Sequence, residues 1–167
     1  VVIHRCLWTT VMLIVTSIFF SKIHSIKKIL SEKKKIVLLF FSGLLIFINW
    51  SVWIYAVSID RIIDASFGYF IMPIISVFLG YIFFKETFTL KSKISVLIVV
   101  ISILFLIFYD FKSIPWVGII VALSWSFYNL IRKKIDVETD IGLLIESLFI
   151  LPAILIAFYF IIQNNVN

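Results

Sequence analysis

The feature that most constrains this chain is a series of six apolar stretches, each close to the length at which a helix crosses a lipid bilayer. A transmembrane helix needs about 20 residues, at about 1.5 Å per residue, to cross about 30 Å of hydrocarbon. The period-two alternation of a membrane β-barrel is absent, and in lipid the helix is the other way to pair every backbone amide. We therefore predict an all-α fold, a polytopic membrane helix bundle. Its six transmembrane helices are expected at residues 1–20, 36–58, 65–84, 94–109, 114–131 and 141–162.

The composition agrees with a membrane protein. Apolar residues make up 63% of the chain, the mean hydropathy is +1.19, and charged residues make up 14%, against about 25% in a typical soluble domain. The fourth apolar stretch is short, so we expect it to extend into its flanks. A single cysteine, Cys6, excludes an internal disulfide and a four-cysteine metal site. The net charge of +6 lies in clusters that flank apolar stretches, which predicts contact with lipid and no nucleic-acid partner.

The basic residues predict the orientation of the helices, because Lys and Arg are retained in the cytoplasmic loops. Twelve of the 15 fall in the connections 21–35, 85–93 and 132–140. The opposite side holds the other three, which are Arg5, Arg61 and Lys112. We therefore expect these three basic loops to be cytoplasmic and both chain ends to be outside.

The amino end has no initiator methionine, since the chain starts with Val1. With Val1 outside, we expect an upstream helix to be missing and the chain to be a fragment or a truncated gene product. A secretory signal peptide is rejected because residues 21–35 lack a small-residue cleavage site and are strongly basic.

Two charged residues lie about one turn inside predicted helices, where an ionisable group costs about 2.5 kcal/mol or more. Arg5 lies in the first helix and Glu146 in the last. Because burying a charge in the bilayer is costly, each of these two residues is a candidate functional residue. The alternatives are that Arg5 extends to the outer headgroups, and that Glu146 is hydrated or protonated near the inner surface.

Two further predicted helices each have one face made of polar or small residues. In helix 36–58, Ser42, Asn49 and Trp53 share one face, which predicts contact with a polar cavity or, as the alternative, an interhelical hydrogen bond from Asn49. In helix 114–131, small and polar residues predict close packing against another backbone rather than substrate contact. That ridge consists of Gly118, Ala122, Ser126 and Asn129.

Helix 65–84 contains Pro73, which removes the amide that would bond to Tyr69. We expect a kink at mid-depth, with neighbours or water pairing the freed carbonyl. Kinked helices border substrate sites in transporters, although a kink can also be purely structural.

Enzyme motifs are absent. Tyr109-Asp110 matches half of an intramembrane aspartyl protease signature, but no GxGD follows. There is no HExxH, no intramembrane serine protease pair and no phosphate-binding loop. We therefore predict that the chain is not an enzyme and has no catalytic residues and no metal site.

Five stretches together resemble one family. They are "HRCLW" at 4–8, "NWSVWIYAV" at 49–57, "DASFGYFIMPIISVFLGYIFFKE" at 64–86, "IPWVGIIVALSWSFYNLIRKK" at 114–134 and "GLLIESLFILP" at 142–152. In this order they resemble the RarD branch of the EamA drug/metabolite transporter superfamily. The resemblance implies a ten-helix carrier of the bacterial inner membrane, built from two five-helix inverted repeats, that moves small metabolites or drugs by alternating access.

The resemblance also divides the chain. Residues 1–109 would hold helices two to five of the first repeat, and residues 114–162 would hold helices six and seven, the start of the second. Helices two and seven are equivalent in inverted repeats. Aligning them places Arg5 opposite Glu146, on the two faces of the membrane.

The same resemblance implies candidate pathway residues. Arg5 would contact an anion or carboxylate, and Glu146 would be the proton-coupling carboxyl. The cavity wall would be formed by Trp8, Asn49, Trp53 and Tyr69. Pro73 would form the kink, and Met72 stands where the family pattern leads us to expect Asn.

The partners implied are a small-molecule substrate, membrane lipid, and either the missing helices of the same transporter or a second copy of the chain. No cofactor is predicted, and coupling to protons is left open. The alternative function is a non-transporting membrane remnant or interaction subunit of a degraded or split transporter gene.

Overall fold

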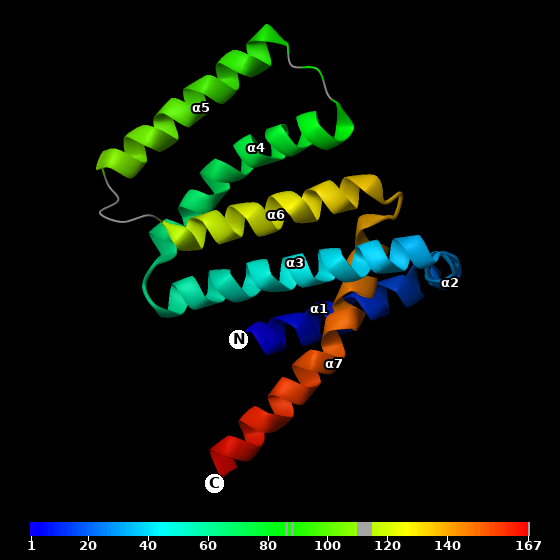
Figure 1. Cartoon of the computed structure of the whole chain (residues 1–167). Helices are drawn as coiled ribbons and strands as arrows, with labels where there is room; N and C mark the ends of the chain where they lie inside the picture. The colour runs from blue at the N-terminus through cyan, green and yellow to red at the C-terminus, as the bar shows by residue number, and fades with distance from the viewer. Residues whose placement is uncertain (86, 88, 110–114, 167) are drawn as a thin grey trace. The chain divides into compact units, whose positions relative to one another are not determined.

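The computed structural model describes residues 1–85, 87, 89–109 and 115–166, and this part of the chain is helical, with no strand in it (Figure 1). The prediction of an all-α fold is confirmed. The described helices are α1 (Val2–Phe19), α2 (Ile23–Ser31), α3 (Lys33–Ser58), α4 (Ile62–Phe84), α5 (Leu90–Tyr109), α6 (Trp116–Lys134) and α7 (Thr139–Val166).

Among the described residues, five helices are long and apolar enough to cross a membrane, namely α1, α3, α4, α5 and the Thr139–Ile156 part of α7. The chain is therefore a multi-pass membrane protein. The remaining predicted span, 114–131, forms α6, but this helix is less apolar because it includes Asn129 and ends in basic residues. The helix is confirmed from Trp116 onward, and its passage through the bilayer stays a prediction.

Most helix boundaries differ from the predicted ranges by a few residues, and two of the differences are informative. The first connection contains α2, which was not predicted as a helix because it is only nine residues long. Its isoleucines recur at positions 23, 26 and 29, so one face is apolar, and Ile29 is buried. Helix α5 begins at Leu90 rather than at residue 94, which confirms that the short fourth stretch extends into its flank.

The chain forms two compact units. Unit 1 comprises Val1–Phe47 with Ile131–Asn167, and unit 2 comprises Ile48–Leu130. Helices α3 and α6 each contribute residues to both units. These units do not test the predicted division into repeats at residues 1–109 and 114–162, which stays a prediction.

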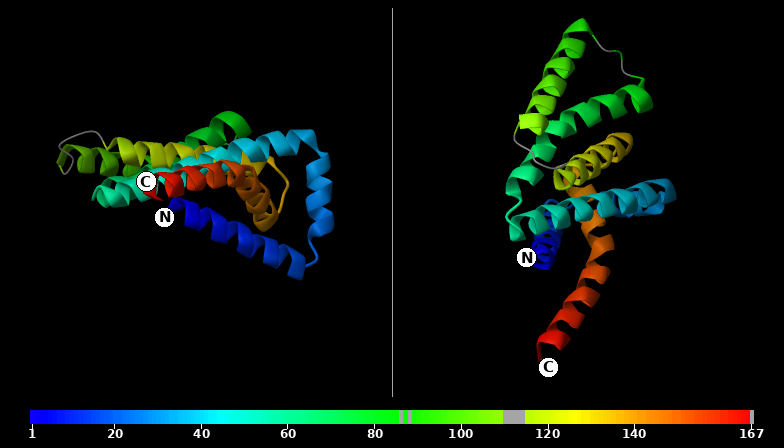
Figure 2. Two further views of the ribbon diagram at one scale, coloured as in Figure 1. Left: turned by 90° about the horizontal axis from the view of Figure 1, so that it is seen from below. Right: turned by 60° about the vertical axis from the view of Figure 1, so that its left-hand side comes forward.

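In unit 1, α1 packs against α7, and the two helices cross (Figure 1). Helix α2 lies across the ends of the two helices that it joins, α1 and α3 (Figure 2). Its buried face contributes to a core in which side chains from α2, α3, α7 and the turn before α7 meet. This core consists of Ile29, Leu39, Ile135, Ile141 and Ile145.

In unit 2, α4 approaches α6 closely at two glycines. A Cβ atom on Gly68 would lie 2.5 Å from the carbonyl oxygen of Gly118, and one on Gly118 would contact the carbonyl oxygen of Asp64. The predicted packing role of the small-residue ridge is therefore confirmed at Gly118. The ridge prediction is wrong for Asn129, which is exposed because it lies near the polar end of α6.

Candidate functional site

The carboxyl group of Glu146 is buried in unit 1, with an exposed fraction of 0%. The hydroxyl of Ser42, on α3, donates a hydrogen bond to Glu146 Oε1 over 2.6 Å. The guanidinium of Arg132, at the end of α6, lies 3.7 Å from the same oxygen through Nη1. A carboxyl group in an apolar span thus has a hydroxyl and a positive charge beside it, which is the arrangement that would make its ionised form tolerable.

Two glycines make this arrangement possible. A Cβ atom on Gly43 would lie 3.2 Å from the carbonyl oxygen of Glu146, so its absence lets α3 approach α7. A Cβ atom on Gly142 would overlap the guanidinium of Arg132. Gly142 precedes Glu146 by one helical turn, so the bare backbone at Gly142 leaves space for the guanidinium beside the carboxyl.

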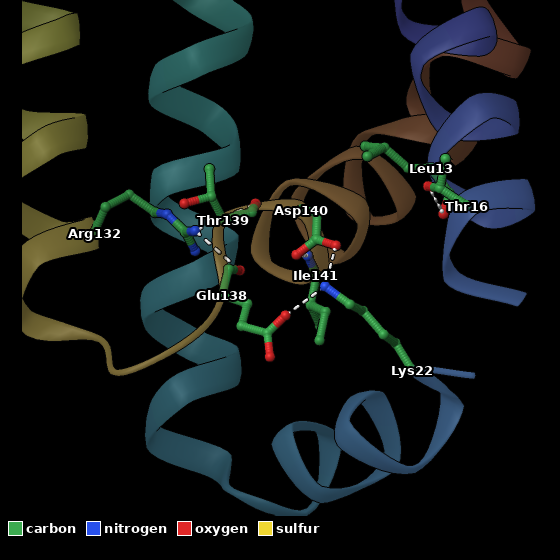
Figure 3. A network of polar contacts seen from close by, with 8 residues as sticks. All are labelled: Leu13, Thr16, Lys22, Arg132, Glu138, Thr139, Asp140 and Ile141. Atoms are coloured by element: carbon green, nitrogen blue, oxygen red, sulfur yellow. Dashed lines mark hydrogen bonds and ion pairs between the residues drawn. The ribbon is translucent and has the colours of Figure 1, made fainter. Parts of the chain in front are cut away.

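A second charged group lies where α7 begins (Figure 3). Lys22, in the turn after α1, donates to Glu138 Oε2 over 2.5 Å and to Asp140 Oδ2 over 2.7 Å. The hydrogen bond to Asp140, followed by that to Glu138, raises the pKa of Lys22 above its usual value. These bonds hold the turn after α1 against the start of α7.

Arg132 also contacts the start of α7 (Figure 3). Its Nη2 lies 3.4 Å from the carbonyl oxygens of Glu138 and Thr139. The guanidinium is therefore fixed between the first turn of α7 and Glu146.

In unit 2, Asn49 is buried on α3 and its Nδ2 donates to the carbonyl oxygen of Val121 and to the hydroxyl of Ser124, both over 3.1 Å. These are the interhelical hydrogen bonds that the alternative interpretation of Asn49 requires. One turn further along α3, the ring of Trp53 meets that of Tyr69 edge to face, with 5.4 Å between the ring centres. Tyr69 is 45% exposed, so this aromatic pair lies at the edge of the unit.

Pro73 lies inside α4, next to a contact with α6. The hydroxyl of Ser126 donates to the carbonyl oxygen of Met72 over 3.2 Å and lies 3.3 Å from the hydroxyl of Ser76. A neighbouring helix therefore supplies a donor beside the proline, but its acceptor is the carbonyl of Met72, so the expected pairing of the Tyr69 carbonyl stays a prediction.

The remaining candidates lie on α1. Arg5 is exposed, and Trp8 is 66% exposed. The structure thus brings Asn49, Trp53 and Tyr69 into one region of unit 2 and places Glu146 in unit 1. The cavity between α4 and α5, of about 330 Å³, is lined by apolar side chains and Lys93, and none of the candidates lines it. Asp110, Lys112 and Ile114, named in the sequence analysis, lie outside the described residues.

Sequence reasoning missed Arg132 and Lys22 as parts of the site, because both belong to basic clusters that indicate membrane orientation. The sequence held one signal for Arg132. Gly142 lies one helical turn before Glu146, so it leaves space on the same helix face for a side chain from another segment.

Comparison with known proteins identifies the family. Residues 1–108 match the EamA-like transporter family. Protein RarD of Escherichia coli strain K12 is 32% identical over 164 residues, which cover 98% of this chain and 55% of that protein. Protein RarD of Salmonella typhi is 36% identical over 149 residues, covering 89% and 50%. The uncharacterized transporter YojE of Bacillus subtilis is 35% identical over 153 residues, covering 89% and 51%.

The chain spans about half the length of the curated relatives it matches. No solved structure matches it. The family match covers more than half of the chain, and the relatives resemble it along nearly its whole length. The chain belongs to the EamA-like transporter family and is similar to its RarD proteins.

Proposed function

We propose that the chain is part of a secondary carrier that moves small metabolites or drugs across the bacterial inner membrane by alternating access, with Glu146 as its proton-binding carboxyl. The observation that carries this proposal is the complete burial of Glu146 in an apolar span, between Ser42 and Arg132. Ionisable groups within a membrane are costly, and they mark proton relays and substrate paths.

The position of Lys22 supports the proposed orientation. Its bonds to Glu138 and Asp140 bring the first and fifth connections together. Loops on one side of the membrane can meet in this way, and the charge distribution assigns both to the cytoplasm. The three basic loops, 21–35, 85–93 and 132–140, would then be cytoplasmic.

Substrate contacts are proposed for the remaining candidates. Asn49, Trp53 and Tyr69 would form a wall with an amide at its buried end and two aromatic rings toward its exposed end. Arg5 and Trp8 would contact the substrate or the other helices of the carrier from α1.

The test is transport by the product of the open reading frame that contains this chain. The purified protein would be reconstituted in liposomes with an imposed pH gradient and given a panel of labelled amino acids, sugars, nucleosides and organic acids. We expect saturable, gradient-stimulated uptake of at least one compound. Uptake equal to that of protein-free liposomes for every compound, by a protein that circular dichroism shows to be helical, would contradict the proposal.

The second candidate function is a non-transporting remnant or interaction subunit, in which polar contacts such as that of Asn49 with Ser124 serve helix packing alone. The DNA that flanks the coding sequence separates the two candidates. One upstream and three downstream helices in frame favour the carrier, whereas stop codons on both sides favour the remnant.

A further inference from the structure

We propose that Arg132 is a positioning residue that holds Glu146 in its ionised form until the carrier takes up a proton. The proposal rests on the proposed role of Glu146 and goes beyond it, because it assigns control of that role to a residue at the end of a different helix.

The guanidinium of Arg132 is largely buried. The side chain of Arg132 is only 11% exposed, and its Nη1 is buried with no hydrogen-bond acceptor within the described part of the chain. The charge that compensates it in an ion pair is the carboxylate of Glu146, at 3.7 Å. A buried cation without a counter-ion is strongly unfavourable, so the guanidinium favours the ionised carboxyl at Glu146.

The backbone at Gly142 makes space for this pair. The guanidinium occupies the position that a side chain at residue 142 would fill, and that residue is glycine. Nη2 approaches the carbonyl oxygens of Glu138 and Thr139. Together these contacts hold the guanidinium beside α7 and Glu146, whereas the neighbouring Lys133 and Lys134 are exposed.

Arg132 is the cation that forms an ion pair with Glu146 in the described part of the chain, and the charged groups on the elements next to α7 are paired elsewhere or exposed. From α3, Ser42 offers a neutral hydroxyl. At the start of α7, Glu138 and Asp140 are paired with Lys22, and Lys35 is paired with Glu32. On α1, which packs against α7, the ionisable side chains are the exposed His4 and Arg5 and the buried Cys6.

The consequence is a link between proton uptake and the turn that joins α6 to α7. With Glu146 ionised, the pair has no net charge. When a proton binds the carboxylate, the pair becomes a buried cation, which is unfavourable until the guanidinium moves toward water or an anion reaches it. Protonation would therefore release the end of α6 from α7.

The experiment follows the protonated carboxyl band of Glu146 by infrared difference spectroscopy, using the same reading-frame product in lipid nanodiscs. The band is assigned by its loss in Glu146→Gln. We expect no Glu146 band at neutral pH in the wild-type protein and a clear band in Arg132→Gln. Gly142→Ala should also produce the band, although it retains the arginine, because the methyl group displaces the guanidinium. Arg132→Lys should restore the wild-type spectrum.

The matched control is Lys133→Gln, which removes one exposed positive charge from the same helix end and should leave the spectrum unchanged. A band at neutral pH in the wild-type protein, or its absence from both Arg132→Gln and Gly142→Ala, would overturn the proposal. Arg132→Gln removes the guanidinium, whereas Gly142→Ala displaces it. If one of these variants does not fold, the other still tests the proposal. The infrared spectrum does not depend on transport. A negative transport assay in liposomes, which contradicts the proposed carrier function, can therefore be told apart from a negative infrared result, which contradicts the role of Arg132.

Discussion

Ser42 of α3 donates a hydrogen bond of 2.6 Å to Glu146 of α7, although 104 positions separate the two residues in the chain. Both side chains are fully buried. A short hydroxyl–carboxylate bond of this kind is a charge-assisted contact, and here it joins the helix that carries the buried carboxyl to the helix that carries the polar stripe.

Replacing Ser42 by alanine removes this donor and leaves the carboxylate buried. Hydrogen bonds to charged groups contribute about 1.5–3 kcal/mol, so we expect Ser42→Ala to lower the free energy of unfolding in detergent by about that amount. Ser95→Ala is the control, since Ser95 is exposed on α5. Equal stability of Ser42→Ala and the control, measured by chemical denaturation, would show that the contact contributes little.

The apolar spans could be predicted because a membrane imposes its own length on a helix, and the runs of Ile, Leu, Val and Phe have that length. Helix α2 could not be predicted in this way. It is amphipathic and short, and its Ile29 belongs to a core cluster with Leu39 and Ile145, a tertiary arrangement that the local pattern does not specify.

The buried site was predicted in part. Glu146 stood out because a carboxyl in an apolar run is costly, and Asn49 because it lies on a polar stripe. Arg132 could not be separated from Lys133 and Lys134, since its inward direction depends on the missing side chain at Gly142. The contact of Arg132, at the end of α6, with Glu146, inside α7, depends on how the backbone turns between the two helices, and a sequence pattern does not specify that turn.

The ion pairs of Lys22 predict a dependence of stability on pH. Hydrogen bonds to Asp140 and Glu138 raise the pKa of Lys22 in the folded protein. Its contribution is therefore fully present below about pH 10.4, the unfolded value, and is lost as the pH rises through the folded value. The difference in melting temperature between wild type and Lys22→Gln should shrink at alkaline pH.

The control for Lys22 is Lys28→Gln, which removes an exposed charge on α2. Its difference from wild type should stay small over the same pH range. A Lys22→Gln difference that is constant from neutral to strongly alkaline pH would mean that the ion pairs do not stabilise the fold.

The glycine contact between α4 and α6 predicts a packing defect. A Cβ atom on Gly118 would contact the backbone of Asp64 and lie 3.0 Å from the amide nitrogen of Gly68. Overpacking of this kind costs about 1–3 kcal/mol, so Gly118→Ala should unfold at lower denaturant than wild type. Leu123→Ala, at an exposed position of α6, should unfold close to wild type, and similar midpoints for both variants would contradict the close approach.

The proposed orientation predicts which loops water-soluble reagents reach. In a Cys6→Ser background, a cysteine at Lys28 should react with a membrane-impermeant maleimide in inside-out vesicles only. A cysteine at Ser58, at the exposed end of α3, should react in right-side-out vesicles only. The reverse pattern would place the basic loops outside.

The most direct test of the account is the response of Glu146→Gln to a pH gradient in proteoliposomes. The substrate is the panel compound that the wild-type protein takes up fastest, and protein-free liposomes give the background. We predict that the gradient stimulates uptake by the wild-type protein and has no effect on the variant. Stimulation of Glu146→Gln equal to that of the wild type would show that the buried carboxyl does not carry the proton.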